Sequence, residues 1–158
     1  MPSLGETLAD QLDRSLDTLE EAIRRCDEVT WRAEDAEGGW GIARQAYHAV
    51  ESVDYLSPNT PEGFKFFRRL GSNWESSPAE AMPSREEVLA YLAEVKREAR
   101  SRLEARTIDV FMTADGFGEG TGDTALGTAL YNLRHLQHHV GQINLRLRTS
   151  GLSPAEWR

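Results

Sequence analysis

The hydrophobic positions near the start of the chain recur at intervals of three and four residues, as they do on one buried face of an α-helix. This pattern predicts a first helix over residues 4–28. Ser3 and Glu6 have the spacing of a capping box, in which each side chain satisfies a free backbone N–H at the helix start. The apolar face of this helix consists of Leu8, Leu12, Leu16, Leu19, Ile23 and Cys26.

Three further segments show the same periodicity. One spans residues 41–57, and the longest spans residues 123–151. Between them, a helix begins at Ser84, which has the spacing of a second capping box with Glu87. The regular alternation of apolar and polar residues that marks strands is nearly absent. The sequence therefore predicts an all-α four-helix bundle formed by a single domain over residues 1–158.

Two long connections join the predicted helices. Residues 58–83 hold four of the six prolines but are also rich in aromatic residues, so we expect this crossover to pack against the bundle. A short helix is expected within it at residues 62–70, and its length allows the two flanking helices to run parallel. Residues 107–122 carry alternate glycines without the Lys-Ser/Thr end of a phosphate loop, and we expect a surface loop.

Three of the four histidines fall within five residues of the last predicted helix. His135 and His139 are one turn apart at the edge of its apolar face, where two imidazoles can converge on one metal ion. His138 points further toward solvent. His48 lies in the second predicted helix and completes a three-histidine site if these helices are neighbours. Such a site leaves positions open for water or substrate.

The histidine spacing excludes two familiar metal sites. There is no His-Glu-x-x-His, so a zincin-type protease is excluded. There is no Glu-x-x-His pair of the kind that builds di-iron sites in ferritin-like bundles.

The His-x-x-His-His-x-Gly-Gln-Ile motif of residues 135–143 resembles the last-helix motif of the DinB/YfiT-like family of metal-binding four-helix bundles. Residues 40–48, which open with tryptophan and end with histidine, are similar to that family as well. The resemblance implies a bundle with a long crossover, commonly dimeric. It also implies one divalent ion per chain on His48, His135 and His139, with the remaining histidine of the motif not a ligand.

The same resemblance implies an enzyme, since the family includes S-transferases that use low-molecular-weight thiols and members described as metal-dependent hydrolases. Three imidazoles suit Zn²⁺, Ni²⁺ or Fe²⁺ and not Mg²⁺ or Ca²⁺. Because free histidine titrates at about 6.5, metal affinity is expected to fall as the pH drops through about 6. Glu51 and Asp54 follow His48 in the second predicted helix, but nothing in the sequence identifies either as a general base.

Two alternatives remain open at this point. One is a non-enzymatic metal-binding protein of a stress-response or interaction type, whose ion is structural. The other is a plain bundle with solvated histidines. Tyr131 and Gln142, on the face of His135, either orient a bound water or substrate or cap the site. Trp31, Trp40 and Trp74 are expected to act as packing anchors.

Charge and composition limit the partners and the compartment. With 26 acidic residues against 18 Lys and Arg, the formal net charge is −8, which repels nucleic-acid phosphates. No apolar run reaches the roughly 18–20 residues of a membrane helix, and the acidic start is unlike a secretory signal. The single cysteine, Cys26, fits a reducing compartment and is expected to be an inert core thiol. We expect a cytoplasmic homodimer acting on small thiols or electrophiles, with no nucleic-acid or membrane partner.

Overall fold

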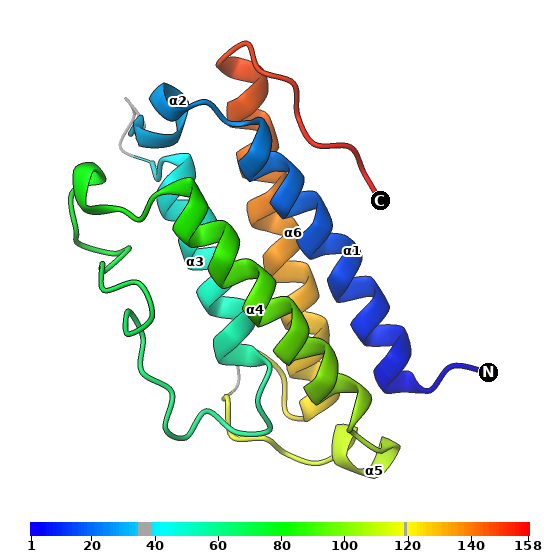
Figure 1. The fold of residues 1–158 in the computed structure, drawn as a ribbon. Coiled ribbons are helices and arrows are strands. Elements are labelled where there is room, and N and C mark those ends of the chain that lie inside the picture. Colours follow the sequence, from blue (N-terminus) through cyan, green and yellow to red (C-terminus); the bar gives the residue numbers. More distant parts are fainter. Residues whose placement is uncertain (35–38, 119) are drawn as a thin grey trace.

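The computed structural model describes residues 1–34, 39–118 and 120–158. Within these residues all regular secondary structure is helical, which confirms the predicted all-α class. Four long helices form a bundle, and shorter helical segments lie in its connections (Figure 1). The long helices are α1 (Leu4–Arg25), α3 (Ile42–Leu56), α4 (Arg85–Glu104) and α6 (Ala125–Thr149).

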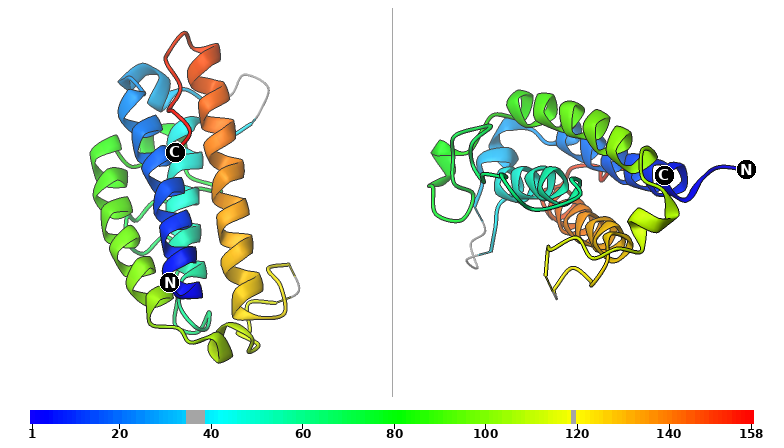
Figure 2. Two further views of the ribbon diagram at one scale, coloured as in Figure 1. Left: turned by 90° about the vertical axis from the view of Figure 1, so that its right-hand side faces the viewer. Right: turned by 90° about the horizontal axis from the view of Figure 1, so that it is seen from below.

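The four long helices pack in the cyclic order α1, α4, α3, α6, so that each lies against two neighbours. α1 and α6 run in one direction, and α3 and α4 run in the opposite direction (Figures 1 and 2). The crossover of residues 58–83 carries the chain back along the bundle before α4 begins, which allows α3 and α4 to be parallel as expected. This order also makes α3 and α6, the two histidine-bearing helices, direct neighbours.

The first predicted helix begins as expected but ends earlier. Ser3 and Glu6 form the capping box at its start, with the Glu6 amide 3.1 Å from the Ser3 hydroxyl oxygen. The prediction of one helix over residues 4–28 is wrong at the other end, because Cys26 is extended and α1 stops at Arg25. The Asp27 carboxylate accepts a hydrogen bond from a backbone amide and starts a separate short helix, α2 (Glu28–Arg32). Hydrophobic periodicity alone does not register a break of two residues.

The crossover contains turns in place of the expected helix. Residues 62–70 form no helix, and Phe67 within them has a φ of 65°, a left-handed value that no right-handed helix accommodates. One short 3₁₀ helix, η1 (Ala79–Ala81), lies later in the segment. The expectation that the crossover packs against the bundle holds, since Trp74 within it is only 8% exposed.

The second connection is partly helical. Thr107 caps a four-residue helix, α5 (Ile108–Phe111), whose last residue is fully buried, so the expected surface loop is shorter than residues 107–122. Residue 119 lies outside the described residues. Over the part of the chain that the structure describes, no helix has the length and apolar character needed to cross a membrane.

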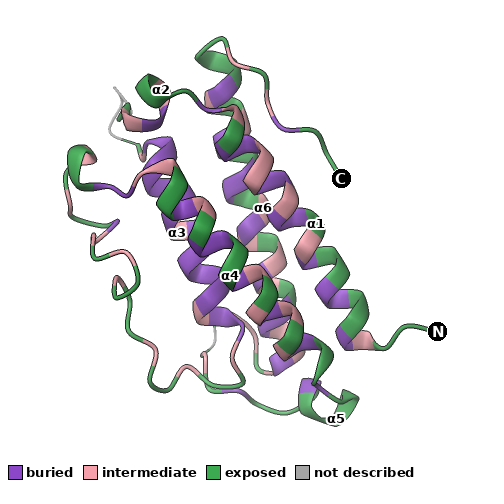
Figure 3. Ribbon diagram, viewed as in Figure 1, coloured by how far each residue is buried: buried purple, intermediate pink, exposed green. Residues whose placement is uncertain are grey.

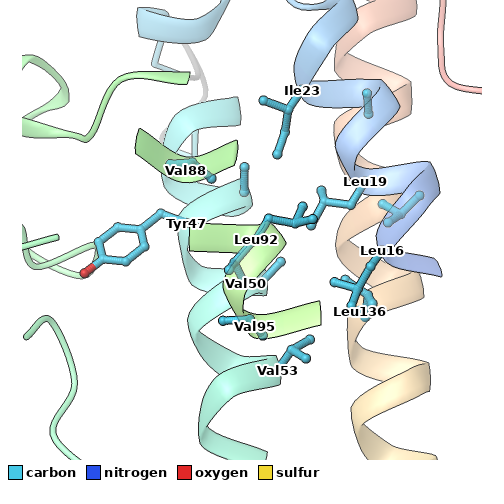
Figure 4. Packing of buried hydrophobic residues seen from close by; sticks show 14 of the residues in the cluster. Leu16, Leu19, Ile23, Tyr47, Val50, Val53, Val88, Leu92, Val95 and Leu136 are labelled. Atoms are coloured by element: carbon cyan, nitrogen blue, oxygen red, sulfur yellow. The ribbon is translucent and has the colours of Figure 1, made fainter. Parts of the chain in front are cut away.

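The core lies along the bundle axis, where α1, α4 and α6 bury their inward faces and expose their outer faces (Figure 3). α3 is buried on nearly all sides, because the crossover packs on the side that faces away from the axis. Leucine side chains of α1 and α6 meet the smaller branched side chains of α3 and α4, which fills the space between four helices at close packing (Figure 4). Members of this core include Leu16, Leu19, Ile23, Val50, Val53, Val88, Leu92, Val95 and Leu136.

The Cys26 thiol is 1% exposed, and burial raises its pKa to about 12. At pH 8 a thiol with that pKa is ionised in about one molecule in ten thousand, so it is a poor nucleophile. We expect native protein to resist alkylation by iodoacetamide at pH 8, whereas protein unfolded in guanidinium chloride reacts fully, as mass spectrometry would show. Rapid alkylation of the native protein would contradict the assignment of Cys26 as a core thiol.

Gly5 lies at a close approach of α1 to the end of α4. A Cβ at Gly5 would lie 2.2 Å from the backbone oxygen of Leu103, whereas a Cβ at Gly141, within α6, would meet nothing within 4 Å. We expect Gly5→Ala to lower the free energy of unfolding by about 1–3 kcal/mol because a backbone has to move. Gly141→Ala should raise it by up to about 1 kcal/mol through helix propensity. Urea unfolding of both variants is the measurement, and equal effects of the two substitutions would contradict the close approach.

Candidate metal centre

Three histidines from two neighbouring helices meet on one side of the bundle. His48 lies near the middle of α3, and His135 and His139 lie one turn apart in α6. One ring nitrogen from each residue lies within 4.8 Å of the other two. The sequence could place two of these imidazoles on one helix face, and the packing of α3 against α6 brings the third to them.

The distances between the Nε2 atoms suit one shared ion. His135 Nε2 lies 3.3 Å from His48 Nε2 and 3.2 Å from His139 Nε2. Two nitrogens bound tetrahedrally at about 2.0–2.1 Å from a zinc-like ion lie about 3.3–3.4 Å apart. Two of the three nitrogen–nitrogen distances are therefore close to those that such an ion requires, and the third pair, His48 and His139, lies within 4.8 Å.

Hydrogen bonding within the group cannot satisfy all of these nitrogens. A neutral imidazole nitrogen carries either one proton or one lone pair, so His135 Nε2 can form a hydrogen bond with only one of its two histidine neighbours. The Nδ1 atoms of His48, His135 and His139 are also buried and have no hydrogen-bond partner among the described residues. A cation between the three Nε2 lone pairs would satisfy these three nitrogens at once, with the ring protons on Nδ1.

Burial keeps the three imidazoles uncharged. It is the main cause that lowers the pKa of His48 to about 3, that of His139 to about 4 and that of His135 below its usual value. Neighbouring histidines lower these pKa values further because two positive rings would repel one another. The three imidazoles are therefore neutral near neutral pH, and protons would compete with a metal for them only below the pH of about 6 that free histidine gives.

Aromatic rings enclose the group on two sides. The Trp74 and Trp40 rings pack against His48 with centroid distances of 4.2 and 5.1 Å, and Tyr131 stacks on His135 at 5.7 Å. The two tryptophans are packing anchors, as expected, and the residue that they pack against is a histidine of the candidate site. Trp74 comes from the crossover, which has no periodicity that would have indicated such a role.

Two side chains fasten the crossover and its tryptophan to α3. The Glu51 carboxylate is fully buried and accepts hydrogen bonds from Trp74 Nε1 at 2.6 Å and from the Phe67 amide at 2.7 Å. The Arg44 guanidinium donates to the backbone oxygens of Trp74 and Ser77. These contacts hold the Trp74 ring over His48, so Glu51 and Arg44 support the site without touching the ligand nitrogens.

The remaining candidates from the sequence lie apart from the ligand group. His138 is exposed and is not one of the three converging histidines, as its place on the helix indicates. The Asp54 carboxylate is buried against the Tyr91 hydroxyl at 2.9 Å and pairs with arginines, and Glu51 is engaged by the crossover. Neither carboxylate joins the three histidines, so within the described residues the donor set consists of imidazoles alone.

The fold and the site together define an all-α bundle protein with a three-histidine candidate metal centre between two neighbouring helices. Residues 11–143 match the family model described as the DinB superfamily. This match covers most of the chain, and the protein belongs to the DinB superfamily. The resemblance visible in the sequence is thereby confirmed.

A solved structure shares the fold. The chain is similar to a DinB-like protein from Bacillus cereus ATCC 10987, whose crystal structure superposes with a TM-score of 0.68 at 18% identity, covering 94% of each chain. At this level of identity the likeness concerns the fold alone. No curated protein matches the sequence.

Proposed function

We propose that the protein is a divalent-metal-dependent enzyme whose ion is held by His48, His135 and His139. The observation that supports this most directly is the convergence of three uncharged imidazole nitrogens with no carboxylate among them. Neutral nitrogen donors favour one Zn²⁺, Ni²⁺ or Fe²⁺ per chain over Mg²⁺ or Ca²⁺, which prefer oxygen ligands.

The proposed reaction needs a coordination position on the ion that no protein side chain occupies. Three histidine ligands leave at least one coordination position open. His48 and His135 are only partly buried, so the group is accessible from one side. When held by the three histidines, a divalent ion supplies Lewis-acid chemistry, because it lowers the pKa of a water or thiol at the open position. This favours transfer of a low-molecular-weight thiol to an electrophile, or hydrolysis.

The protein's own residues would position the reactants. Tyr131 stacks on His135. The Gln142 side chain lies near His139 and opposes the effect of burial on the pKa of that histidine. We infer that Tyr131 and Gln142 flank the incoming group and orient it. No side chain is assigned as general base, since the Glu51 and Asp54 carboxylates are engaged elsewhere.

A non-catalytic role of the ion is the second candidate. The three ligands join α3 to α6, so a bound ion would also stabilise the contact between these helices and serve a metal-binding or interaction protein. In that case the ion raises the unfolding temperature but no exogenous ligand binds to it.

We also propose a homodimer. Leu130 and Leu145 of α6 are 52% and 59% exposed, and apolar side chains on the outer face of a bundle helix are suited to contact with a second copy. Sedimentation equilibrium should give twice the chain mass of 17.7 kDa. A species of the single-chain mass at high micromolar concentration would contradict the dimer.

Reconstitution tests the proposed enzyme. Metal-free protein, and protein reloaded separately with Zn²⁺, Ni²⁺ or Fe²⁺, would be assayed with several small thiols and electrophiles and with activated esters. We expect turnover only in a metal-loaded form, lost in His135→Ala and kept in His138→Ala. Tight binding of one ion per chain without turnover or ligand exchange would favour the structural role, and no binding would reject both.

A further inference from the structure

A continuous strip of aromatic side chains runs away from His48 across the outer surface. Trp74 packs on His48, Phe66 lies 6.5 Å from Trp74, and Tyr55 lies 4.8 Å from Phe66 between ring centroids. Successive rings touch along the whole length of this strip. We call it the aromatic strip; its members are Trp40, Tyr55, Phe64, Phe66, Phe67, Trp74 and Phe117.

The aromatic strip lies at the edge of the core: Trp74 belongs to the core cluster, and Trp40 and Phe67 pack against it. Of its seven members only Trp74 is buried; Phe66 is 41% exposed, and the others are partly buried. Beyond Trp74 the rings contact one another, and each keeps part of its surface open to solvent. Adjoining aromatic rings that are only partly covered are suited to pack against an apolar group of a ligand.

The strip gathers segments that are far apart in the sequence. Tyr55 comes from α3, three of the phenylalanines from the crossover, and Phe117 from the connection before α6. Two connections without helical periodicity thus place their aromatic residues at one face of α3. Bringing together side chains from separate segments at one place is typical of a binding site, because loops carry specificity while helices hold the scaffold.

The strip lies on the same side of α3 as the metal ligand. His48 and Tyr55 are seven residues apart, so they share one face of the helix and lie about 10 Å apart along its axis. Trp74 contacts His48 directly, at the end of the strip nearest the partly exposed histidines. The rings therefore continue from the candidate metal centre along α3, in the order His48, Trp74 and Phe66.

We propose that the aromatic strip binds the aryl group of an aromatic thiol, so that the substrate class is a small thiol carrying an aromatic ring. This rests on the proposed function of the three histidines. Aromatic side chains pack favourably against a flat apolar group in offset or edge-to-face geometry, and they gain little from a small hydrophilic molecule. The strip thus selects by the apolar end of the substrate, whereas the three histidines hold the ion that meets its reactive end.

The test uses two thiols that differ by one phenyl ring. Co²⁺-loaded protein would be titrated with 2-phenylethanethiol and with ethanethiol, with the visible spectrum of the cobalt as readout of binding. We expect the phenyl compound to bind on the order of tenfold to a hundredfold more tightly, since the ring becomes buried against the strip. Equal affinities would overturn the proposed substrate class while leaving the metal centre intact.

Variants locate the effect. Phe66→Ala should reduce the preference for the phenyl compound to about threefold or less, because it removes the most exposed ring of the strip. Phe117→Ala, at the far end, serves as a second variant if the first proves unstable. Val29→Ala removes part of an exposed apolar side chain of α2, outside the strip, and should leave the preference unchanged. A preference undiminished in both phenylalanine variants overturns the proposal.

Metal binding keeps this inference separate from the function on which it rests. The phenylalanine variants should still bind one Co²⁺ per chain, because they lack no ligand nitrogen. If wild-type protein binds no cobalt, the proposed function fails. If it binds cobalt but does not discriminate between the two thiols, only the role of the aromatic strip fails.

Discussion

Alanine in place of His48, His135 or His139 is expected to abolish stoichiometric metal binding. Each substitution removes one of three nitrogens that converge within 4.8 Å, and two imidazoles cannot hold a tetrahedral ion nearly as tightly. Loss of supporting contacts around metal ligands typically costs about tenfold to a hundredfold in affinity, so loss of a ligand should cost about a hundredfold or more. Elemental analysis of purified, dialysed protein measures the effect directly.

His138→Ala is the matched control for these variants. It removes an imidazole from the same helix, but from an exposed position outside the converging group. We expect it to retain one ion per chain and the affinity of the wild type. If His138→Ala empties the site while His135→Ala remains loaded, the ligand assignment is wrong.

Glu51→Leu should be the most destabilising substitution near the site. The Glu51 carboxylate accepts hydrogen bonds from Trp74 Nε1 and from the Phe67 amide, and leucine would leave both donors buried without partners. An unsatisfied buried donor costs about 1–3 kcal/mol, so the free energy of unfolding should fall by about 2–5 kcal/mol. Urea unfolding followed by circular dichroism gives this value, and tryptophan fluorescence reports the release of Trp74.

Two controls separate hydrogen bonding from charge in this experiment. Glu51→Gln keeps the shape and one acceptor oxygen, so we expect a smaller loss than with leucine. Glu62→Gln neutralises an exposed carboxylate of the same crossover and should change stability by less than about 0.5 kcal/mol. A stability of Glu51→Leu equal to that of the wild type would contradict the anchoring of the crossover by Glu51.

Helical periodicity predicted the bundle because all four long helices carry apolar stripes, and capping boxes mark the starts of α1 and α4. The same logic placed His135 and His139 on one face, since their spacing needs only the geometry of a helix. His48 could be assigned only through resemblance to a family, because pairing of two helices that are distant in sequence is decided by packing around the whole bundle.

The errors arose where local side-chain chemistry overrides periodicity. The Asp27 carboxylate caps a new helix and so ends α1 early, and the left-handed backbone of Phe67 prevents a helix within residues 62–70. The hydrogen bond between Glu51 and Trp74, which holds the crossover at the site, could not be predicted from the sequence for a different reason. A buried carboxylate contradicts the hydropathy pattern, and its importance follows only from two donors that the crossover brings to it.

A crystal of the Zn²⁺-loaded protein, with anomalous diffraction data collected at the zinc edge, tests the central claim most directly. The account predicts one strong anomalous peak per chain, about 2.0–2.1 Å from the Nε2 atoms of His48, His135 and His139, with a fourth position open to solvent. A peak ligated by His138 or by carboxylates, or no peak between α3 and α6, would contradict it.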